Sequence, residues 1–316
     1  MRIQLGWFDT KLAKRIADIA AGELEPAAPR NAATVMVVRD APAGGVEVLM
    51  LKRPAAMQFA GGAYVFPGGS VDKADYGKAD YDKADYDKAG SGNADYGKAG
   101  SGNADYDQAH FDNDAAGWLG PSATELGEHL GATPDLAAAL VRAAIRETFE
   151  EVGILLAGTP DGAVVVPDGP DWVADRAALN AGTLTLAELL ERRGLVLRAD
   201  LLTPWARWIT PLAEPKRFDA RFFAAALPAG QQVVAHAAEA ETIAWVRPQD
   251  ALDAARRGEM SLLPPTATTL GEFTLAGSVA DILGRAREVA PIQPVLINSD
   301  DGQAWLEVPD GVGYPL

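Results

Sequence analysis

The spacing of apolar side chains changes several times along the chain, and each change predicts a different element. Leucine and isoleucine recur at helical intervals over residues 10–20, which favours an N-terminal helix. Two apolar runs, 33–39 and 46–53, flank a Pro-Ala-Gly-Gly turn and predict a hairpin. A last hairpin is expected from 294–297 and 304–308. Further strands are expected at 205–210, 217–227 and 242–246, and further helices at 172–179, 185–193, 248–252 and 278–289.

The strongest helical signal runs from Pro134 to Val152, with Gly153 as its terminator. On this helix Glu147, Glu150 and Glu151 share one face, with Cβ atoms about 5–6 Å apart. Like charges at that spacing repel, so helix stability does not favour the pattern. A divalent cation with hard oxygen ligands, Mg²⁺ or Mn²⁺, reverses the sign of the interaction. The alternative is a solvated acidic helix face.

Residues 73–114 differ in composition from the rest of the chain. They run in five-residue units of the type Lys-Ala-Asp-Tyr-Gly, with Gly-Ser-Gly variants. The segment holds ten aspartates and five lysines and contains no leucine, isoleucine, valine or methionine. Such a composition cannot bury enough surface to offset chain ordering, so we expect a flexible, disordered acidic repeat. A pentapeptide-repeat β-helix and a calcium-binding role for the aspartates are the alternatives.

The composition narrows the classes of function. A net charge of −16 disfavours binding to nucleic acid or to an anionic membrane, both of which attract basic patches. The chain has no cysteine and only three histidines, which excludes a disulfide framework and disfavours a zinc site. The N-terminus lacks the apolar core of a signal peptide, so we expect a cytoplasmic protein. The sequence does not predict an oligomeric state.

Two separated segments together resemble the Nudix hydrolase box, written G-x₅-E-x₇-R-E-u-x-E-E-x-G-u with u aliphatic. Residues 146–154 match its second half, and Gly69, at the end of a Phe-Pro-Gly-Gly turn, matches its opening glycine. The box places its arginine 14 positions after that glycine, whereas Arg146 lies 77 positions after Gly69. The excess contains the whole repeat segment. Counting back eight from Arg146 reaches Ala138 where the box has glutamate, so that carboxylate is missing or comes from elsewhere.

A long insertion inside the box is similar to the coenzyme A diphosphatase-like branch of the family. This resemblance implies a Nudix-type α/β/α sandwich with a mixed sheet, carrying the repeat insertion and helical additions. It predicts an N-terminal helical extension over 1–29 and a Nudix domain over 30–255. A C-terminal helical extension and hairpin would follow over 256–316, packed on the same domain.

The resemblance also implies a chemistry, in which metal-activated water cleaves a diphosphate linked to another group. Glu147, Glu150, Glu151 and the Gly69 carbonyl would hold Mg²⁺ or Mn²⁺. Arg146 would fix the rotamer of a glutamate through a charge-assisted pair. The general base would be a box glutamate or an acid on a later loop, Glu239 or Glu241. The candidate substrate-binding residues are Arg53, Phe66, Gly68, Arg217 and Glu241.

The expected partner is a small nucleotide-type diphosphate. Coenzyme A or acyl-coenzyme A is the first candidate, and an NADH- or ADP-ribose-type dinucleotide is the second. A catalytically silent Nudix-fold ligand-binding protein is the alternative of a different class, because one box carboxylate is not found by counting back to Ala138.

Overall fold

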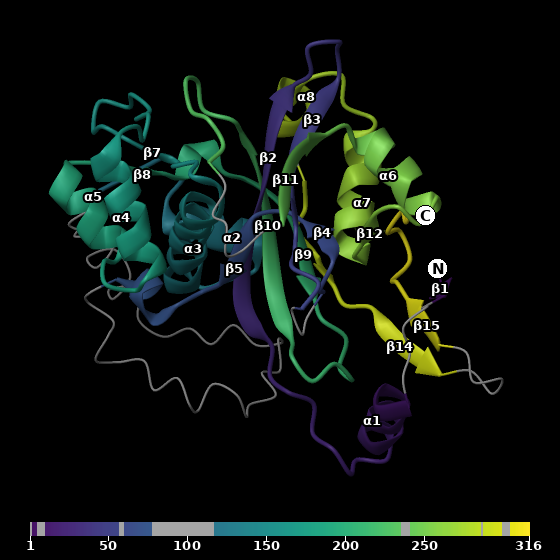
Figure 1. Cartoon of the computed structure of the whole chain (residues 1–316). Helices are drawn as coiled ribbons and strands as arrows, with labels where there is room; N and C mark the ends of the chain where they lie inside the picture. Colours follow the sequence, from purple (N-terminus) through teal and green to yellow (C-terminus); the bar gives the residue numbers. More distant parts are fainter. Residues whose placement is uncertain are drawn as a thin grey trace.

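The computed structural model describes residues 2–4, 10–56, 60–77, 117–234, 241–285, 287–298 and 304–316. A mixed nine-stranded sheet separates two layers of helices (Figure 1). Along the sheet the strands are β12 (Ser261–Leu262), β4 (Ala63–Val65), β3 (Val46–Lys52), β2 (Arg30–Asp40), β10 (Phe218–Ala226), β9 (Thr203–Ile209) and β13 (Pro291–Ile292). Two more strands belong to the sheet: β11 (Thr242–Val246) pairs with β3, and β5 (Gly68–Ser70) pairs with β2. The predicted α/β/α sandwich is confirmed.

Strands β2 and β3 separate beyond their hairpin, and this opening positions the glycine turn. The two strands pair antiparallel only near the hairpin, where Val38 faces Val48. Further along, β4 takes the place beside β3 and β5 the place beside β2, where Gly68 faces Thr34. The Phe-Pro segment between β4 and β5 therefore crosses from one strand to the other. The predicted hairpin of β2 and β3 is confirmed. The crossing between β4 and β5 places Gly68 beside β2, in the middle of the sheet.

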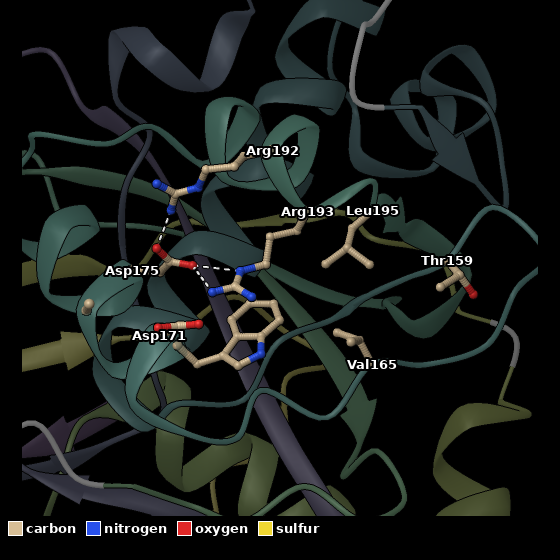
Figure 2. A pocket seen from close by; sticks show the side chains of 9 residues that line it. Thr159, Val165, Asp171, Asp175, Arg192, Arg193 and Leu195 are labelled. Carbon is tan, nitrogen blue, oxygen red and sulfur yellow. Dashed lines mark hydrogen bonds and ion pairs between the residues drawn. The ribbon is translucent and has the colours of Figure 1, made fainter.

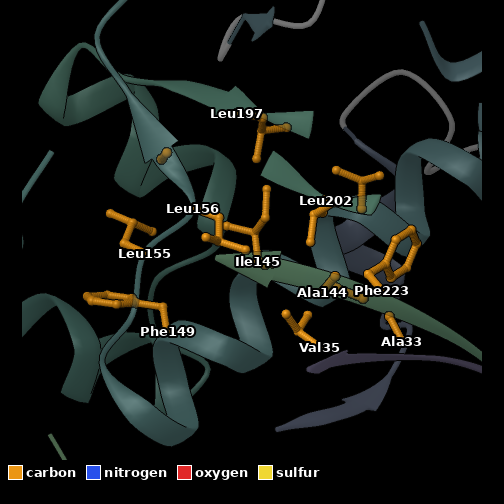
Figure 3. Close-up of a cluster of buried hydrophobic side chains, with 14 of the residues drawn as sticks. Ala33, Val35, Ala144, Ile145, Phe149, Leu155, Leu156, Leu197, Leu202 and Phe223 are labelled. Atoms are coloured by element: carbon orange, nitrogen blue, oxygen red, sulfur yellow. The ribbon is translucent and has the colours of Figure 1, made fainter. Parts of the chain in front are cut away.

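Helix α3 (Pro134–Val152) has the bounds that its caps predict. Thr133 accepts a hydrogen bond from the Leu136 N–H, and Gly153 ends the helix with φ of 74°. Its apolar side packs on the sheet through a buried cluster that Figure 3 shows around Ile145 and Phe223. The other helices of this layer are α2 (Ala123–Leu130), α4 (Pro170–Asn180) and α5 (Leu186–Arg193). A small sheet of β6 (Trp118–Leu119), β8 (Val196–Arg198) and β7 (Ala157–Gly158), with the 3-10 turn η3 (Ala199–Leu201), lies beside them.

A second apolar cluster fills the opposite face of the sheet. On β2, Val35 and Val37 belong to the α3 cluster, while Met36 and Val38 belong to the second one, as strand alternation requires. The second layer contains α1 (Thr10–Ala20), α6 (Pro248–Arg256), α7 (Pro264–Phe273) and α8 (Val279–Leu283). The sheet of β1 (Arg2–Gln4), β15 (Ala304–Glu307) and β14 (Val295–Asn298) includes both strands of the predicted last hairpin.

Three sequence predictions need correction. Helices α2 and α7 were not expected, and the helix expected over 278–289 ends at Leu283 because Gly284 caps it. The repeat was expected to be disordered from residue 73, yet Lys73–Tyr76 forms the 3-10 helix η1 with Asp75 buried. The remainder of the repeat, 78–114, lies outside the described residues. Within the described part of the chain, no helix has the length and apolarity that crossing a membrane requires.

Candidate active site

Two glycines let backbone come close to the carboxylate face of α3. The Gly68 N–H donates to Oε2 of Glu151 over 2.8 Å. Gly68 has φ of 153°, and a Cβ there would overlap the carbonyl oxygen of Ala33. A Cβ on Gly69 would overlap Oε1 of Glu147. A side chain at position 68 would push the turn away from β2, and one at position 69 would push it away from α3, which explains the glycine pair.

The guanidinium of Arg146 connects the turn, the helix and the start of the repeat. Its Nη1 donates to Glu147 over 2.9 Å and to Glu150 over 3.1 Å. Its Nη2 donates to the Ser70 carbonyl over 3.0 Å, and Nε and Nη2 donate to the carboxylate of Asp75 over 3.0 and 2.9 Å. The contact predicted between Arg146 and a glutamate is present, and it is one part of a larger buried network.

Asp75 stands where the box requires a carboxylate. Counting forward from Gly69 across five residues reaches Asp75, an aspartate in place of the usual glutamate. Counting back to Ala138 left open a carboxylate that comes from elsewhere, and Asp75 fits that alternative: Ala138 is buried in α3, whereas the carboxylate of Asp75 contacts Arg146. Two further contacts fix Asp75: its carboxylate accepts the Asp72 N–H, and its carbonyl accepts Nη1 of Arg142 over 2.9 Å.

Burial sets the charge states of this network. Desolvation raises the pKa of Glu147 to about 7, with Arg146 acting in the opposite direction and Glu150 adding to the rise. Desolvation also raises the pKa of Asp75, against the pull of Arg146. For Arg146 desolvation acts to lower the pKa, but the surrounding carboxylates, Asp75 first, hold it above its ordinary value. Arg146 thus forms ion pairs with three carboxylates, those of Asp75, Glu147 and Glu150. One positive charge does not balance three carboxylates, so a bound cation could neutralise the remainder.

The donor set fits a hard divalent cation, although the side chains are not arranged around one. In the described part of the chain, no three carboxylate or imidazole groups are grouped as a metal site. The reason is visible in the contacts: Glu147 and Glu150 turn to Arg146, and Glu151 turns to the Gly68 N–H. Three carboxylates beside a glycine that has no room for a Cβ supply the oxygen ligands that Mg²⁺ and Mn²⁺ prefer. The assignment of Glu147, Glu150, Glu151 and Gly69 as ligands stays a prediction.

Two of the expected substrate-binding residues stand next to the paired ends of β3 and β11. Arg53 follows β3, and its buried Nε has no hydrogen-bond partner in the part of the chain that the structure describes. Glu241 precedes β11, where it accepts the Ala55 N–H and forms an ion pair of 3.2 Å with Lys52. These contacts lower the pKa of Glu241, which disfavours it as a general base. The other loop candidate, Glu239, lies outside the described residues.

Two other candidates lie elsewhere, and their role in substrate binding stays a prediction. Phe66 is buried in the cluster on the opposite face of the sheet, whereas its neighbour Val65 packs against the cluster beneath α3. Arg217 donates to the backbone carbonyls of Thr210 and Ala27, and these bonds hold loops together.

Sequence patterns did not predict the contact made by Arg176. This buried arginine of α4 donates through Nε and Nη2 to the Glu150 carbonyl, over 3.0 and 2.8 Å. It places a positive charge at the C-terminal end of α3, where the helix dipole and the carboxylates are both negative. Arg176 reaches the end of α3 because α4 packs on α3, and no sequence motif predicts that packing.

Two hollows accompany the site. The larger, of about 700 Å³, lies against α4 and α5 (Figure 2). Within it Asp175 pairs with both Arg192 and Arg193, and Arg193 stacks on Trp172 at 3.9 Å from the ring centre. Its charged groups therefore neutralise one another. The smaller hollow, of about 450 Å³, lies on the sheet face that α3 covers. Its lining is formed by Arg39, Leu49, Leu227, Gln231, Gln232, Val233, Ile243, Ala244 and Trp245.

Comparisons with known proteins agree with this geometry. The family model described as the NUDT19 Nudix domain matches residues 29–272. A human protein named acyl-coenzyme A diphosphatase NUDT19 is 28% identical over 283 residues, which span 85% of this chain and 72% of that protein. A Gallus gallus protein of the same name is 26% identical, over 80% of this chain and 70% of its own length. The crystal structure of a Nudix hydrolase from Alicyclobacillus acidocaldarius superposes with a TM-score of 0.61 and 26% identity, over 83% of this chain and 98% of that one. Since the family model matches well over half of the chain, this protein belongs to the Nudix hydrolases of the NUDT19 Nudix-domain family.

Proposed function

We propose that this protein hydrolyses the diphosphate bond of coenzyme A or acyl-coenzyme A with the help of Mg²⁺ or Mn²⁺. The observation that carries the proposal is the Asp75–Arg146 pair, which joins the two halves of the split box into one buried network. It also removes the main argument for a silent ligand-binding protein, which was the missing carboxylate. The substrate class is taken from the relatives named acyl-coenzyme A diphosphatase.

In the proposed reaction, water forms a bond to one phosphorus and the bond from that phosphorus to the bridging oxygen breaks. Two phosphate monoesters result. A divalent cation held by Glu147, Glu150 and Glu151 would activate the water and neutralise charge on the phosphate oxygens. Arg146 holds two of these glutamates on one face of α3, and Gly68 holds the third. Arg53, whose buried Nε has no hydrogen-bond partner among the described residues, is the proposed contact for a phosphate oxygen.

The test is a substrate screen with chromatographic identification of both products. Free coenzyme A, an acyl-coenzyme A, NADH and ADP-ribose are each incubated with Mg²⁺ or Mn²⁺, and Glu150→Gln serves as the inactive control. The proposal expects 3′,5′-ADP and a phosphopantetheine product, with kcat/KM highest for a coenzyme A substrate. A preference for NADH or ADP-ribose would contradict the substrate assignment, and no turnover with either metal would contradict the enzymatic one.

A further inference from the structure

Two buried arginines, one turn apart on α3, contact the start of the repeat. Arg142 and Arg146 are each 8% exposed. They stand at positions i and i+4 of the helix and therefore share one face, where like charges repel. Asp75 reverses the sign of this interaction. Its carbonyl accepts a hydrogen bond from Nη1 of Arg142 over 2.9 Å, and its carboxylate forms the ion pair with Arg146.

The bond from Arg142 falls at the end of a short helix. Asp75 is the third residue of the 3-10 helix η1, which ends at Tyr76. The last carbonyls of a helix have no partner within the helix, and a basic side chain can satisfy one of them. Arg142 does so from a position 67 residues further along the chain. The bond therefore fixes the backbone of η1 against α3.

The sequence makes such a bond necessary in two ways. In the Nudix box seven residues separate the carboxylate from the arginine, whereas the 70 residues 76–145 separate Asp75 from Arg146. Chain connectivity brings two groups together less often as the connection lengthens. The box carboxylate is also an aspartate here, one methylene shorter than glutamate, so its backbone must lie closer to the guanidinium. The contact between Arg142 and the Asp75 carbonyl provides that approach.

The position of Asp75 affects the glutamates of α3 through Arg146. Nε and Nη2 of Arg146 donate to the Asp75 carboxylate. Nη1 of the same guanidinium donates to Glu147 and Glu150. Because a guanidinium is planar and rigid, a displacement at one of its edges moves the donors at the other. A loosened Asp75 would therefore change how Arg146 holds the two glutamates.

We propose that Arg142 is a positioning residue of the metal site and that it acts through Asp75. The metal site itself rests on the proposed function. Without Arg142, η1 loses its attachment at the Asp75 carbonyl and Asp75 binds Arg146 less well. Arg146 then binds Glu147 and Glu150 more strongly, which makes both carboxylates less available to a cation. A hydrogen bond from a charged donor corresponds to about tenfold or more in an equilibrium constant.

The test is a double-variant cycle of Arg142→Met and Asp75→Asn, measured by calorimetric Mn²⁺ titration of the full chain. Methionine keeps most of the volume of the arginine and removes its donors. Arg142→Met should raise the dissociation constant for Mn²⁺ about tenfold. Arg142→Lys keeps a charged donor and should recover affinity to within about threefold of wild type. The double variant should bind Mn²⁺ within about twofold of Asp75→Asn alone, whereas independent effects would multiply.

The matched control is Arg15→Ala on α1. Arg15 also donates to a backbone carbonyl, that of Ala213, over 2.8 Å. It belongs to the helix layer on the opposite face of the sheet, where Leu12 of the same helix is buried. Loss of its bond should leave the affinity for Mn²⁺ at the wild-type value.

Two outcomes of the titration overturn the inference. One is wild-type affinity in Arg142→Met. The other is an effect of Arg142→Met that persists undiminished beside Asp75→Asn, which would mean that Arg142 acts by another route. If the wild type does not bind Mn²⁺, the metal assignment of the proposed function fails instead. Urea unfolding of the same four proteins in EDTA then decides the coupling by itself. The double variant should lose less stability than the two single variants together, and a loss equal to their sum would overturn the inference.

Discussion

Replacing Asp75 by asparagine removes the charge that balances the buried guanidinium of Arg146 and changes little in volume. The side chain of Asp75 is 2% exposed and makes two contacts of 2.9–3.0 Å with Arg146. Breaking a buried ion pair from one side costs about 3–5 kcal/mol. Arg146 keeps Glu147 and Glu150 as partners, so we expect the lower end, about 3 kcal/mol of unfolding free energy. Without the charge of Asp75, Arg146 should bind Glu147 and Glu150 more strongly and make both carboxylates less available to a cation. The dissociation constant for Mn²⁺ should therefore rise at least tenfold.

The matched control is Asp72→Asn, three residues earlier. Asp72 lies 3.7 Å from the same guanidinium, but its side chain is 66% exposed, so its loss should cost no more than about 1 kcal/mol. Urea unfolding and calorimetric Mn²⁺ titration measure the two effects separately. Equal, small effects of the two substitutions on both quantities would refute the assignment of Asp75 as the box carboxylate.

Further predictions concern the repeat, the end of α3 and the proton of Glu147. Replacing residues 78–112 by a short Gly-Ser linker should keep the fold and the hydrolase activity. Removing 73–112 should abolish the activity because Asp75 is lost. Equal activities of these two deletion variants would contradict the prediction. Arg176→Ala should lower stability by about 1.5–3 kcal/mol and lower kcat, because the Glu150 carbonyl loses a charged donor, while Arg176→Lys should recover part of both in urea unfolding and steady-state assays. The folded protein binds the proton of Glu147 with a pKa of about 7, against 4.5 for the unfolded chain, so metal-free stability should fall by up to about 3 kcal/mol as the pH rises from 4.5 to 7. Melting curves in EDTA across this range should show the fall, Glu147→Gln should flatten it, and a flat wild-type curve would refute it.

The features that the sequence predicted well are those with local causes. Helix α3 begins after Thr133 and ends before Gly153 because both caps act within one turn of the helix. The hairpin of β2 and β3 follows from alternation and its turn. The association of Gly69 with α3, by contrast, came from a family resemblance, since spacing across 77 positions has no local physical cause.

The misses have tertiary causes. Asp75 belongs to a unit whose composition is that of the other repeat units, and only its contacts with Arg146 and Arg142 set it apart. Phe66 was grouped with the site because it adjoins the glycine turn, but strand alternation sends its side chain to the other core. Arg176 contacts α3 from a different helix, and a single sequence does not report which helix packs on which.

We propose that the two halves of the split box form one metal-dependent catalytic site. The most direct measurement is a calorimetric Mn²⁺ titration of wild type, Glu150→Gln and Glu128→Gln, with acyl-coenzyme A turnover measured on the same preparations. Glu128 is an exposed glutamate of α2 and serves as the control. Glu150→Gln should weaken Mn²⁺ binding at least tenfold and reduce kcat at least a hundredfold, while Glu128→Gln should match wild type. Wild-type affinity and turnover in Glu150→Gln would contradict it.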